Sequence, residues 1–486
     1  MQVAAYINGK FIAGEGAELR VDNPSDGSEL ACFSGVSIEQ IDMAITAAHQ
    51  AFIKGEWSQR PLAERAATLH RLIDVMEQRA DAIKALLVSE TGCPAHSSSM
   101  QAQFATPMRM AHEIIDLMVS LPESEENPLP ASEQHNRLGQ RVRSLRSYVP
   151  LGVVVGISAY NFPLHTGVWK AIPALIAGNS VILRPNPLTP LSSLAFAEAA
   201  QVVGLPPGVL NVVLESGVAG AQLLTTHPSV DLITFTGSTP VGAQVAAQAA
   251  ATFKRVHLEL GGKSAQIFLP DSVDKASAAA VSVCTAHTGQ GCVLGTRIFV
   301  PQTHQAEVVA QTAAAVAALK VGYSNDATTQ VGPVISANQA KRCEHFVQLA
   351  VEHGGKVVTG GKRPAHLERG FFFEPTVLDL PDNHNPAAQE EIFGPVVSII
   401  GYRDIDHAIE MANDSRYGLS GYIHGANIDE ALAVAGRVES GAVHINGALS
   451  SSYVPFGGIK SSGLGHERGV EGMRMFQRMK IFSVTG

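Results

Sequence analysis

The sequence is poor in cysteine, and its cysteines form no pattern typical of a metal site. Five cysteines occur in 486 residues, with no CxxC pair, and the 18 histidines include no HExxH motif and no zinc-type Cys/His spacing. An odd and sparse set of cysteines in a large chain is typical of a reducing compartment. We therefore expect a cytoplasmic protein without a metal site.

Long apolar runs and runs of one charge are also missing. The longest apolar stretch, residues 149–157, is interrupted by Gly152 and Gly156 and falls far short of the roughly 20 residues that span a bilayer. The first 14 residues do not resemble an export signal. Lys and Arg number 35 against 44 Asp and Glu, a net charge of −9. We expect neither a membrane nor a nucleic acid as partner.

The chain has enough apolar residues for more than one core. Hydrophobic residues make up 45% of it, and its length predicts two or more globular domains. Asn8-Gly9 between two apolar runs predicts a hairpin, and helical apolar spacing follows over residues 37–121. Residues 122–137 are polar and contain proline, which is typical of a linker or a projection.

An alternation of strands and helices comes next. Val/Ile-rich runs at 152–157, 180–184, 209–214, 231–235 and 255–259 are separated by helix-like segments. This alternation predicts a parallel, doubly wound sheet, which binds ligands beyond the carboxyl ends of its strands. A second α/β segment extends from about 262 to 441, and the tail from 472 reads as a helix end followed by a strand.

Four segments are candidates for chemistry, and each has a plain structural alternative. In one of them, residues 390–395, two acids precede an apolar turn, which also fits a solvated face. The turn 236–242, TGSTPVG, is suited to a dinucleotide phosphate, but the GxGxxG fingerprint is absent after the first strand and the turn also fits an ordinary strand-to-helix connection. Cys292 lies in Gly-Gln-Gly-Cys, which suits an accessible nucleophile or a small buried residue; Cys284 resembles a core residue, and Cys343 lies in a charged helix. Glu259 at a strand end is either a general base or an ion-pair partner.

Together these segments resemble the aldehyde dehydrogenase superfamily. The matching motifs are Asn161-Phe162-Pro163, FTGST at 235–239, ELGGK at 259–263, GQGC at 289–292, EIFGP at 391–395 and PFGGIKSSG at 455–463. They occur in order over residues 5–486. The resemblance favours the functional interpretation of Cys292, Glu259 and the 236–242 turn.

The resemblance implies a catalytic role for five residues. Cys292 is expected to attack the aldehyde carbon, so that the thiohemiacetal releases hydride to a nicotinamide and leaves a thioester. The Asn161 amide and the Cys292 N–H are expected to stabilise the oxyanion, and Glu259 to activate the hydrolytic water. Lys170 and Glu467 match positions of a proton relay.

The resemblance also implies a cofactor site. Its expected residues are Ser158, Ala159, Tyr160, Arg184, Gly237, Ser238, Glu391 and Phe393. Two departures stand out: Tyr160 replaces the usual tryptophan, and Pro187 stands where a glutamate often binds the adenosine ribose. The missing carboxylate removes repulsion against a 2′-phosphate, which Arg184 is able to attract. We expect NAD, with NADP as the open alternative.

Family position predicts the lining of the aldehyde tunnel. It comprises Phe162, His165, Thr166, Trp169, Ala286, His287, the 450–453 stretch with Tyr453, and Phe456. None of these is Lys, Arg, Asp or Glu, so we expect a neutral, hydrophobic substrate that is aromatic, terpenoid or medium-chain aliphatic. The alternatives are a broad pocket without preference, a semialdehyde dehydrogenase, a CoA-acylating enzyme and a non-catalytic cofactor-binding relative.

The resemblance implies three parts. They are a Rossmann-like cofactor-binding domain (1–122 and 143–260), an α/β catalytic domain (261–458) and a small β bridging element for oligomerisation (123–142 and 459–486). A homodimer or homotetramer is expected.

Overall fold

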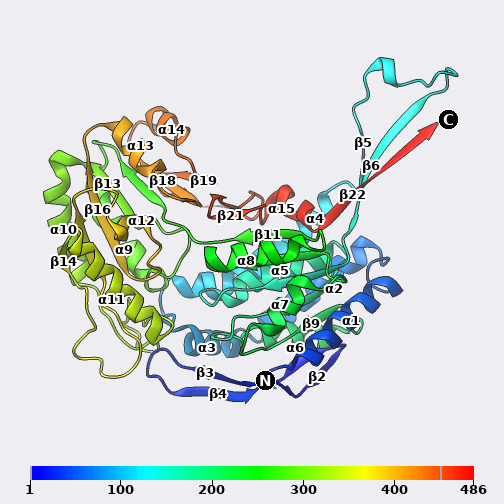
Figure 1. The fold of residues 1–486 in the computed structure, drawn as a ribbon, viewed down its shortest axis with the longest axis horizontal. Coiled ribbons are helices and arrows are strands. Elements are labelled where there is room, and N and C mark those ends of the chain that lie inside the picture. Colours follow the sequence, from blue (N-terminus) through cyan, green and yellow to red (C-terminus); the bar gives the residue numbers. More distant parts are fainter. Residues whose placement is uncertain (1–2, 449–450, 486) are drawn as a thin grey trace.

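The computed structural model describes residues 3–448 and 451–485. It contains two open sheets, each covered by helices, and a small projecting sheet (Figure 1). The chain begins with the predicted hairpin, β1 (Ala5–Ile7) and β2 (Lys10–Ile12). Asn8 and Gly9 both have positive φ, 51° and 79°, as the two-residue turn requires. β3 (Glu18–Asp22) and β4 (Glu29–Ser34) form a separate antiparallel pair.

The first large sheet has the strand order β2-β1-β9-β8-β7-β10-β11-β21. Its parallel centre consists of β7 (Val153–Ile157), β8 (Ser180–Arg184), β9 (Leu210–Val212), β10 (Leu232–Thr236) and β11 (Arg255–Glu259). These are the five strands that the Val/Ile-rich runs predict. The doubly wound α/β prediction is therefore confirmed.

Helices cover both faces of this sheet because its strands alternate two apolar faces. Val154 and Val181 pack with α2 (Leu62–Gln78), α4 (Thr106–Ser120), α5 (Pro163–Ile176) and α6 (Leu194–Val203). Val153 and Val155 pack instead with α1 (Ile38–Lys54), α7 (Ala219–Thr226) and α8 (Thr239–Ala250). α3 (Ala80–Thr91) and a short π-helix, η1 (Gln101–Ala105), complete the layer. Among the described residues no helix combines the length and apolarity needed to cross a membrane.

The second sheet has the order β14-β15-β16-β13-β12-β18-β19. Its strands are β12 (Ala265–Phe268), β13 (Arg297–Pro301), β14 (Lys356–Thr359), β15 (Thr376–Leu380), β16 (Val396–Tyr402), β18 (Ser420–His424) and β19 (Ala442–Ile445); its helices are α9 (Ala276–Thr285), α10 (Gln305–Ala317), α11 (Ala337–Glu352), α12 (Pro386–Gln389), α13 (Ile405–Asn413) and α14 (Ile428–Ala435). All strands except β14 run parallel. This is the second α/β unit that the sequence predicts.

The third sheet projects from the body (Figure 1). It consists of β5 (Ser124–Glu126), β6 (Val142–Pro150) and β22 (Gln477–Thr485), and β6 pairs with β22 along its whole length. The boundary that the resemblance implies assigned residues 143–150 to the cofactor-binding domain. Pro150 and Gly152 instead separate two strands that belong to different sheets.

The segment 459–476 also differs from its expected place in the bridging element. β20 (Ile459–Lys460) pairs with β17 (Tyr417–Gly418), β21 (Gly463–Leu464) joins the first sheet beside β11, and α15 (Gly469–Met475) precedes β22. Only the residues from 477 onward form the projecting strand. The C-terminal segment therefore runs between both large sheets before it reaches the projection.

Candidate active site

The candidate residues gather at the carboxyl ends of the first sheet's strands. Asn161 follows β7, Gly237 follows β10 and Glu259 ends β11. From the other side comes the loop between α9 and β13, which carries Cys292. The Asn161 side-chain amide donates a hydrogen bond to the Gln290 carbonyl oxygen at 2.9 Å. The two large units therefore meet at this point.

Close backbone approaches hold the loop that carries Cys292. A Cβ at position 262 would collide with the Cys292 carbonyl oxygen, and one at position 289 would collide with the Gly394 carbonyl oxygen. Gly289 also has a positive φ of 71°, which favours glycine. The Gln290 side chain accepts a hydrogen bond from the Ile335 N–H at 2.9 Å. These contacts fix the loop without a covalent link.

Cys292 differs from the other cysteines in the interior. It is half-buried, whereas Cys284 and Cys343 are fully buried, and all are unpaired. Burial, followed by the nearby carboxylates Glu391 and Glu259, raises the pKa of the Cys292 thiol. The group therefore rests as a thiol and must transfer its proton to a base before it attacks a carbonyl.

Asn161 is anchored to the loop that carries Cys292. Its carbonyl oxygen accepts from Gln103 Nε2 at 2.7 Å, which fixes the backbone. One of the two hydrogens on Asn161 Nδ2 is used by Gln290, and an amide nitrogen carries two. The second hydrogen is therefore available for another acceptor.

Glu259 lies in a buried network of five side chains. Lys170 Nζ is 3.0 Å from Glu467 Oε1 and donates to Thr234 Oγ1 at 3.3 Å. His257 bonds to Thr234 through Nδ1 at 3.0 Å and to Glu259 Oε1 through Nε2 at 3.3 Å. Burial, with the charge of Glu467, raises the pKa of the Glu259 carboxyl well above its usual value. A raised pKa suits a general base near neutral pH.

Six of the predicted cofactor residues, from Ser158 to Ser238, lie at strand ends of the first sheet, whereas Glu391 and Phe393 belong to the second unit. Ser158 Oγ and Thr236 Oγ1 are buried, and neither has a hydrogen-bond partner among the described residues. Tyr160, which follows Ala159, packs edge-on against Phe393, with ring centroids 5.8 Å apart. The turn at Gly237 and Ser238 leads into the N-terminus of α8, whose free N–H groups suit a phosphate.

Glu391 lies between the two units. Its Oε1 accepts from the Gly262 N–H at 2.9 Å, and burial raises the pKa of its carboxyl to about 7. A Cβ at Gly261 would approach Glu391 Oε2 to 2.8 Å. Gly261 thus leaves room for this carboxylate, and the Gly262 N–H donates to it.

Arg184 is engaged within the protein. Its Nε donates to Glu215 Oε2 at 2.8 Å and one terminal nitrogen donates to the Gly217 carbonyl. Glu215 also accepts from the Gly220 N–H at 2.5 Å, and the Arg184–Glu215 pair is buried. A carboxylate already holds the guanidinium, which disfavours its expected attraction for a 2′-phosphate.

The predicted substrate residues form a chain of rings. Phe162 contacts His287 and His165, His165 contacts Trp169, and Trp169 contacts Phe456, with centroids 4.4 to 6.3 Å apart. Burial lowers the pKa of both histidines to about 4, so both are neutral at pH 7.

The remaining substrate positions differ in exposure. The Thr166 hydroxyl donates to the Phe162 carbonyl at 3.0 Å, and Ala286 ends α9. Tyr453 is exposed, and Ser450 lies outside the described residues.

The family model for the aldehyde dehydrogenase family matches residues 11–482. The chain belongs to the aldehyde dehydrogenase family. Geranial dehydrogenase of Castellaniella defragrans is 36% identical over 483 residues, which cover 99% of this chain and 98% of that protein.

Solved structures of aldehyde dehydrogenases share the fold. A Mycobacterium tuberculosis aldehyde dehydrogenase in complex with NAD+ has a TM-score of 0.92 at 36% identity, covering 98% of this chain and 97% of that chain. AldC of Pseudomonas syringae, a cysteine-to-alanine variant in complex with NAD+ and octanal, has a TM-score of 0.91 at 34% identity, covering 99% and 96%. The resemblance that the motifs predict is therefore confirmed.

Three residues at this aldehyde dehydrogenase site escaped the sequence analysis. His257 stands two residues before Glu259, and strand alternation would have placed both on one face. Arg468 stacks on Trp169 and Phe456, at 5.1 and 4.9 Å from the ring centroids, so the predicted uncharged lining has a cation against it. Glu215 follows β9 and belongs to no recognisable sequence motif, so its pairing with Arg184 is apparent only in the folded structure.

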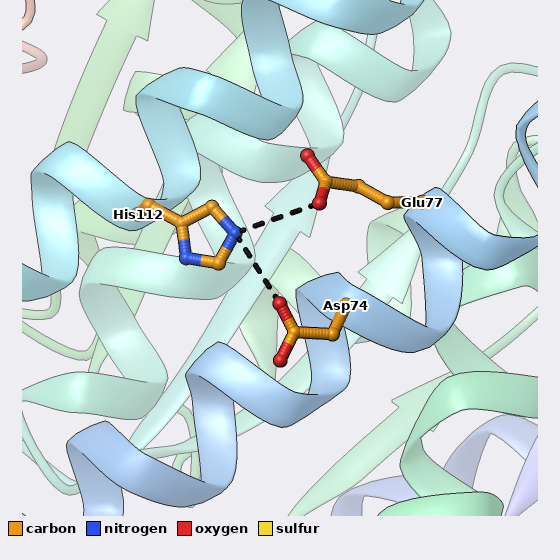
Figure 2. Close-up of side chains that lie close together, drawn as sticks. All are labelled: Asp74, Glu77 and His112. Carbon is orange, nitrogen blue, oxygen red and sulfur yellow. Dashed lines mark ion pairs between the residues drawn. The ribbon is translucent and has the colours of Figure 1, made fainter.

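One further group of titratable side chains lies between α2 and α4 (Figure 2). His112 Nε2 is 3.8 Å from Asp74 and 4.0 Å from Glu77, and both carboxylates are exposed. The His112 ring also stacks on His70, which contacts Asp116 at 3.2 Å. We interpret the group as exposed ion pairs between the two helices, since such pairs form readily without a metal.

The environment of the thiols predicts a selective, pH-dependent alkylation. We expect iodoacetamide to modify Cys292 slowly at pH 7 and progressively faster up to pH 10, because only the thiolate reacts and the Cys292 pKa is raised. Peptide mass spectrometry measures the modification at each site. Cys284 and Cys343 are internal controls that stay unmodified in the native protein, since both are buried. Rapid, pH-independent alkylation of Cys292 would contradict the assignment.

Proposed function

We propose that this protein oxidises an aldehyde to the carboxylic acid with NAD+ through a covalent intermediate on Cys292. The observation that carries the proposal is the convergence of a half-buried thiol, an amide with a free hydrogen and a base of raised pKa at one junction. Each group has one role in acyl chemistry on a cysteine. The family membership supports the same chemistry.

In the first half-reaction, the Cys292 sulfur bonds to the aldehyde carbon and the thiol proton passes to a base. The carbonyl oxygen becomes an oxyanion, to which the second Asn161 Nδ2 hydrogen and the Cys292 backbone N–H donate. When bound, NAD+ supplies a hydride acceptor. The product on the protein is a thioester.

In the second half-reaction, water attacks the thioester carbonyl. Glu259 accepts a proton from this water, the carbon–sulfur bond breaks, and the carboxylic acid leaves with the thiol restored. Glu259 Oε2 is buried and has no partner within residues 3–448 and 451–485. It is therefore the oxygen available to the water.

The residues of this structure fit a dinucleotide. The unpartnered Ser158 and Thr236 hydroxyls and the N-terminus of α8 provide hydrogen-bonding groups at adjacent strand ends. Glu391 is suited to a ribose hydroxyl, and Phe393 and Tyr160 to the face or edge of a ring. The relative from Mycobacterium tuberculosis was solved in complex with NAD+, which supports the same cofactor.

Replacement of Glu259 by glutamine should separate the two half-reactions. We expect Glu259→Gln to release one burst of NADH and then turn over at least 100-fold more slowly, because the thioester forms but its hydrolysis lacks a base. Rapid-mixing absorbance of NADH gives both phases, with and without coenzyme A. Undiminished steady-state turnover would refute the role of Glu259, and rapid turnover only with coenzyme A would favour the acylating alternative.

Cys292→Ala is the matched control for this experiment. It should give neither burst nor turnover, whereas Cys284→Ala should keep both, because Cys284 is a core residue eight positions earlier. A burst that survives in Cys292→Ala would place the nucleophile elsewhere.

The Arg184–Glu215 pair predicts a preference for NAD+ over NADP+. We expect wild-type kcat/KM to be at least tenfold higher with NAD+, because Glu215 occupies the guanidinium and adds negative charge near the expected ribose. Glu215→Gln should narrow this ratio by freeing Arg184 for a 2′-phosphate. Steady-state kinetics with both cofactors measure the ratio. A wild-type preference for NADP+ would contradict the interpretation.

We further propose that the substrate is a neutral, hydrophobic aldehyde, either aromatic, terpenoid or medium-chain aliphatic. The ring chain from Phe162 to Phe456 supports an apolar path, and its two histidines are neutral. The geranial dehydrogenase relative and the octanal complex support the same class. Arg468 favours one alternative substrate, a semialdehyde whose carboxylate pairs with the guanidinium. Against this alternative, two aromatic rings already cover the guanidinium.

A panel of aldehydes tests this proposal. We expect kcat/KM for hexanal and benzaldehyde to exceed that for acetaldehyde by at least tenfold, since each buried CH₂ contributes about 0.8 kcal/mol. Succinate semialdehyde should be a poor substrate. The highest kcat/KM for succinate semialdehyde would contradict the proposal, and equal values for acetaldehyde and hexanal would indicate a pocket without preference.

The projecting sheet supports a homodimer or homotetramer. β22 is an edge strand of nine residues, and its exposed side chains include Met479, Ile481, Phe482 and Val484. A long, apolar edge strand favours pairing with another chain. We propose that β22 extends a sheet in a neighbouring subunit.

A further inference from the structure

His257 occupies a fully buried position beside the proposed base. It lies on β11 two residues before Glu259, so both side chains point to the same face of the sheet. Its cross-strand neighbour on β10 is Thr234. The imidazole thus lies between a hydroxyl and a carboxylate, 3.0 Å from Thr234 Oγ1 and 3.3 Å from Glu259 Oε1.

The hydrogen bonds define the tautomer of His257. The Lys170 ammonium only donates, so Thr234 Oγ1 accepts from it at 3.3 Å. An ionised Glu259 carboxylate only accepts, so the proton of the neutral imidazole lies on Nε2, and Nδ1 accepts the hydroxyl hydrogen of Thr234. His257 therefore carries its own proton on Nε2 and donates it to Glu259 Oε1.

The charges around His257 keep it neutral. Burial and the ammonium of Lys170 on α5, with a smaller effect of His466, lower its pKa well below the usual value. Glu467 Oε1 lies 3.9 Å from Nδ1 but is paired with Lys170 at 3.0 Å. His257 is thus a neutral donor whose direction is set by Thr234 and Lys170.

Glu259 has few other favourable contacts. Glu467 raises the pKa of its carboxyl in addition to burial, while Lys170 and Arg468 lower it. Within the described residues, this carboxylate accepts one hydrogen bond, from His257 to Oε1, and Oε2 has no partner. A donor to the ionised form favours ionisation and fixes the orientation of the group.

We propose that His257 is a positioning residue for deacylation: its Nε2–H holds Glu259 Oε1, which directs Oε2 to the hydrolytic water and favours the ionised carboxylate. The proposal rests on the proposed thioester chemistry. It assigns no contact between His257 and the substrate, the cofactor or Cys292.

A matched pair of variants tests the proposal. In His257→Gln the amide nitrogen reaches the position of Nε2 and keeps the donor to Glu259. In His257→Asn the amide nitrogen lies near the position of Nδ1, which keeps the contact with Thr234 and loses the donor. His424→Asn is the control, because His424 is a second largely buried histidine, stacked on Phe268 and remote in sequence from Glu259.

The acyl-enzyme can be formed without cofactor. The Cys292 sulfur attacks the ester carbonyl of 4-nitrophenyl acetate, 4-nitrophenolate leaves, the thiol proton passes to solvent, and an acetyl thioester remains. Mass spectrometry of the intact protein then follows its hydrolysis over a range of pH. This readout is independent of NADH formation.

We expect His257→Asn to hydrolyse the acyl-enzyme about 10- to 100-fold more slowly than wild type, the range for one hydrogen bond to a charged group. In this variant the hydrolysis rate should rise with pH, and the midpoint of the rise should lie about one pH unit higher than in the wild type. The reason is that the Glu259 pKa increases when the donor is lost. His257→Gln and His424→Asn should retain the wild-type rate and pH profile. Acylation should be unchanged in all three.

Equal hydrolysis rates and pH profiles for His257→Asn and His257→Gln would overturn the proposal. Slow acylation in His257→Asn would also overturn it, because His257 would then act on Cys292. Failure of the wild type to reduce NAD+ with any aldehyde would instead refute the proposed dehydrogenase activity, while the decay of the acyl-enzyme would still test His257.

Discussion

The buried ion pair between Lys170 and Glu467 is the centre of the polar network around Glu259. Both side chains are essentially inaccessible, and their charged atoms are 3.0 Å apart. A buried pair has a large desolvation cost, and loss of one partner leaves an uncompensated charge worth about 3–5 kcal/mol. Here the pair joins α5 to the C-terminal segment. It also orders Thr234, and through it the neutral imidazole beside Glu259.

Two carboxylates close together would normally not both ionise. Glu467 is compensated by Lys170, whereas Glu259 receives one neutral hydrogen bond and the weaker influence of Arg468. The environments of the two acids therefore differ: Glu467 is paired with an ammonium group, and the pKa of Glu259 is raised. This difference follows from the meeting of α5, β10 and β11 with the C-terminal segment that carries Glu467.

The sequence predicts most of the fold because its apolar periodicity is regular. The hairpin at Asn8-Gly9 and the five parallel strands follow from local patterns, and the motifs identify Cys292, Glu259 and Asn161. Patterns along the chain do not reveal pairings between distant segments, such as Arg184 with Glu215 or β6 with β22. The structure differs from the expected boundary at 143 and from the expected place of residues 459–476 for the same reason. These residues pair with strands that lie far away in the sequence. The role proposed for His257 depends on Thr234 and Lys170, which only the folded chain brings to it.

The separation of Lys170 and Glu467 by 297 residues has a consequence for biosynthesis. The ribosome delivers Lys170 long before its counter-ion, and β21, which closes the first sheet beside β11, also arrives late. During translation the ammonium must therefore remain hydrated or find a temporary partner. A chain that ended at residue 466 would contain every strand of both large sheets, β21 included, yet it would lack the anion that pairs with this buried cation. The charge network can therefore be completed only when synthesis of the chain is nearly finished.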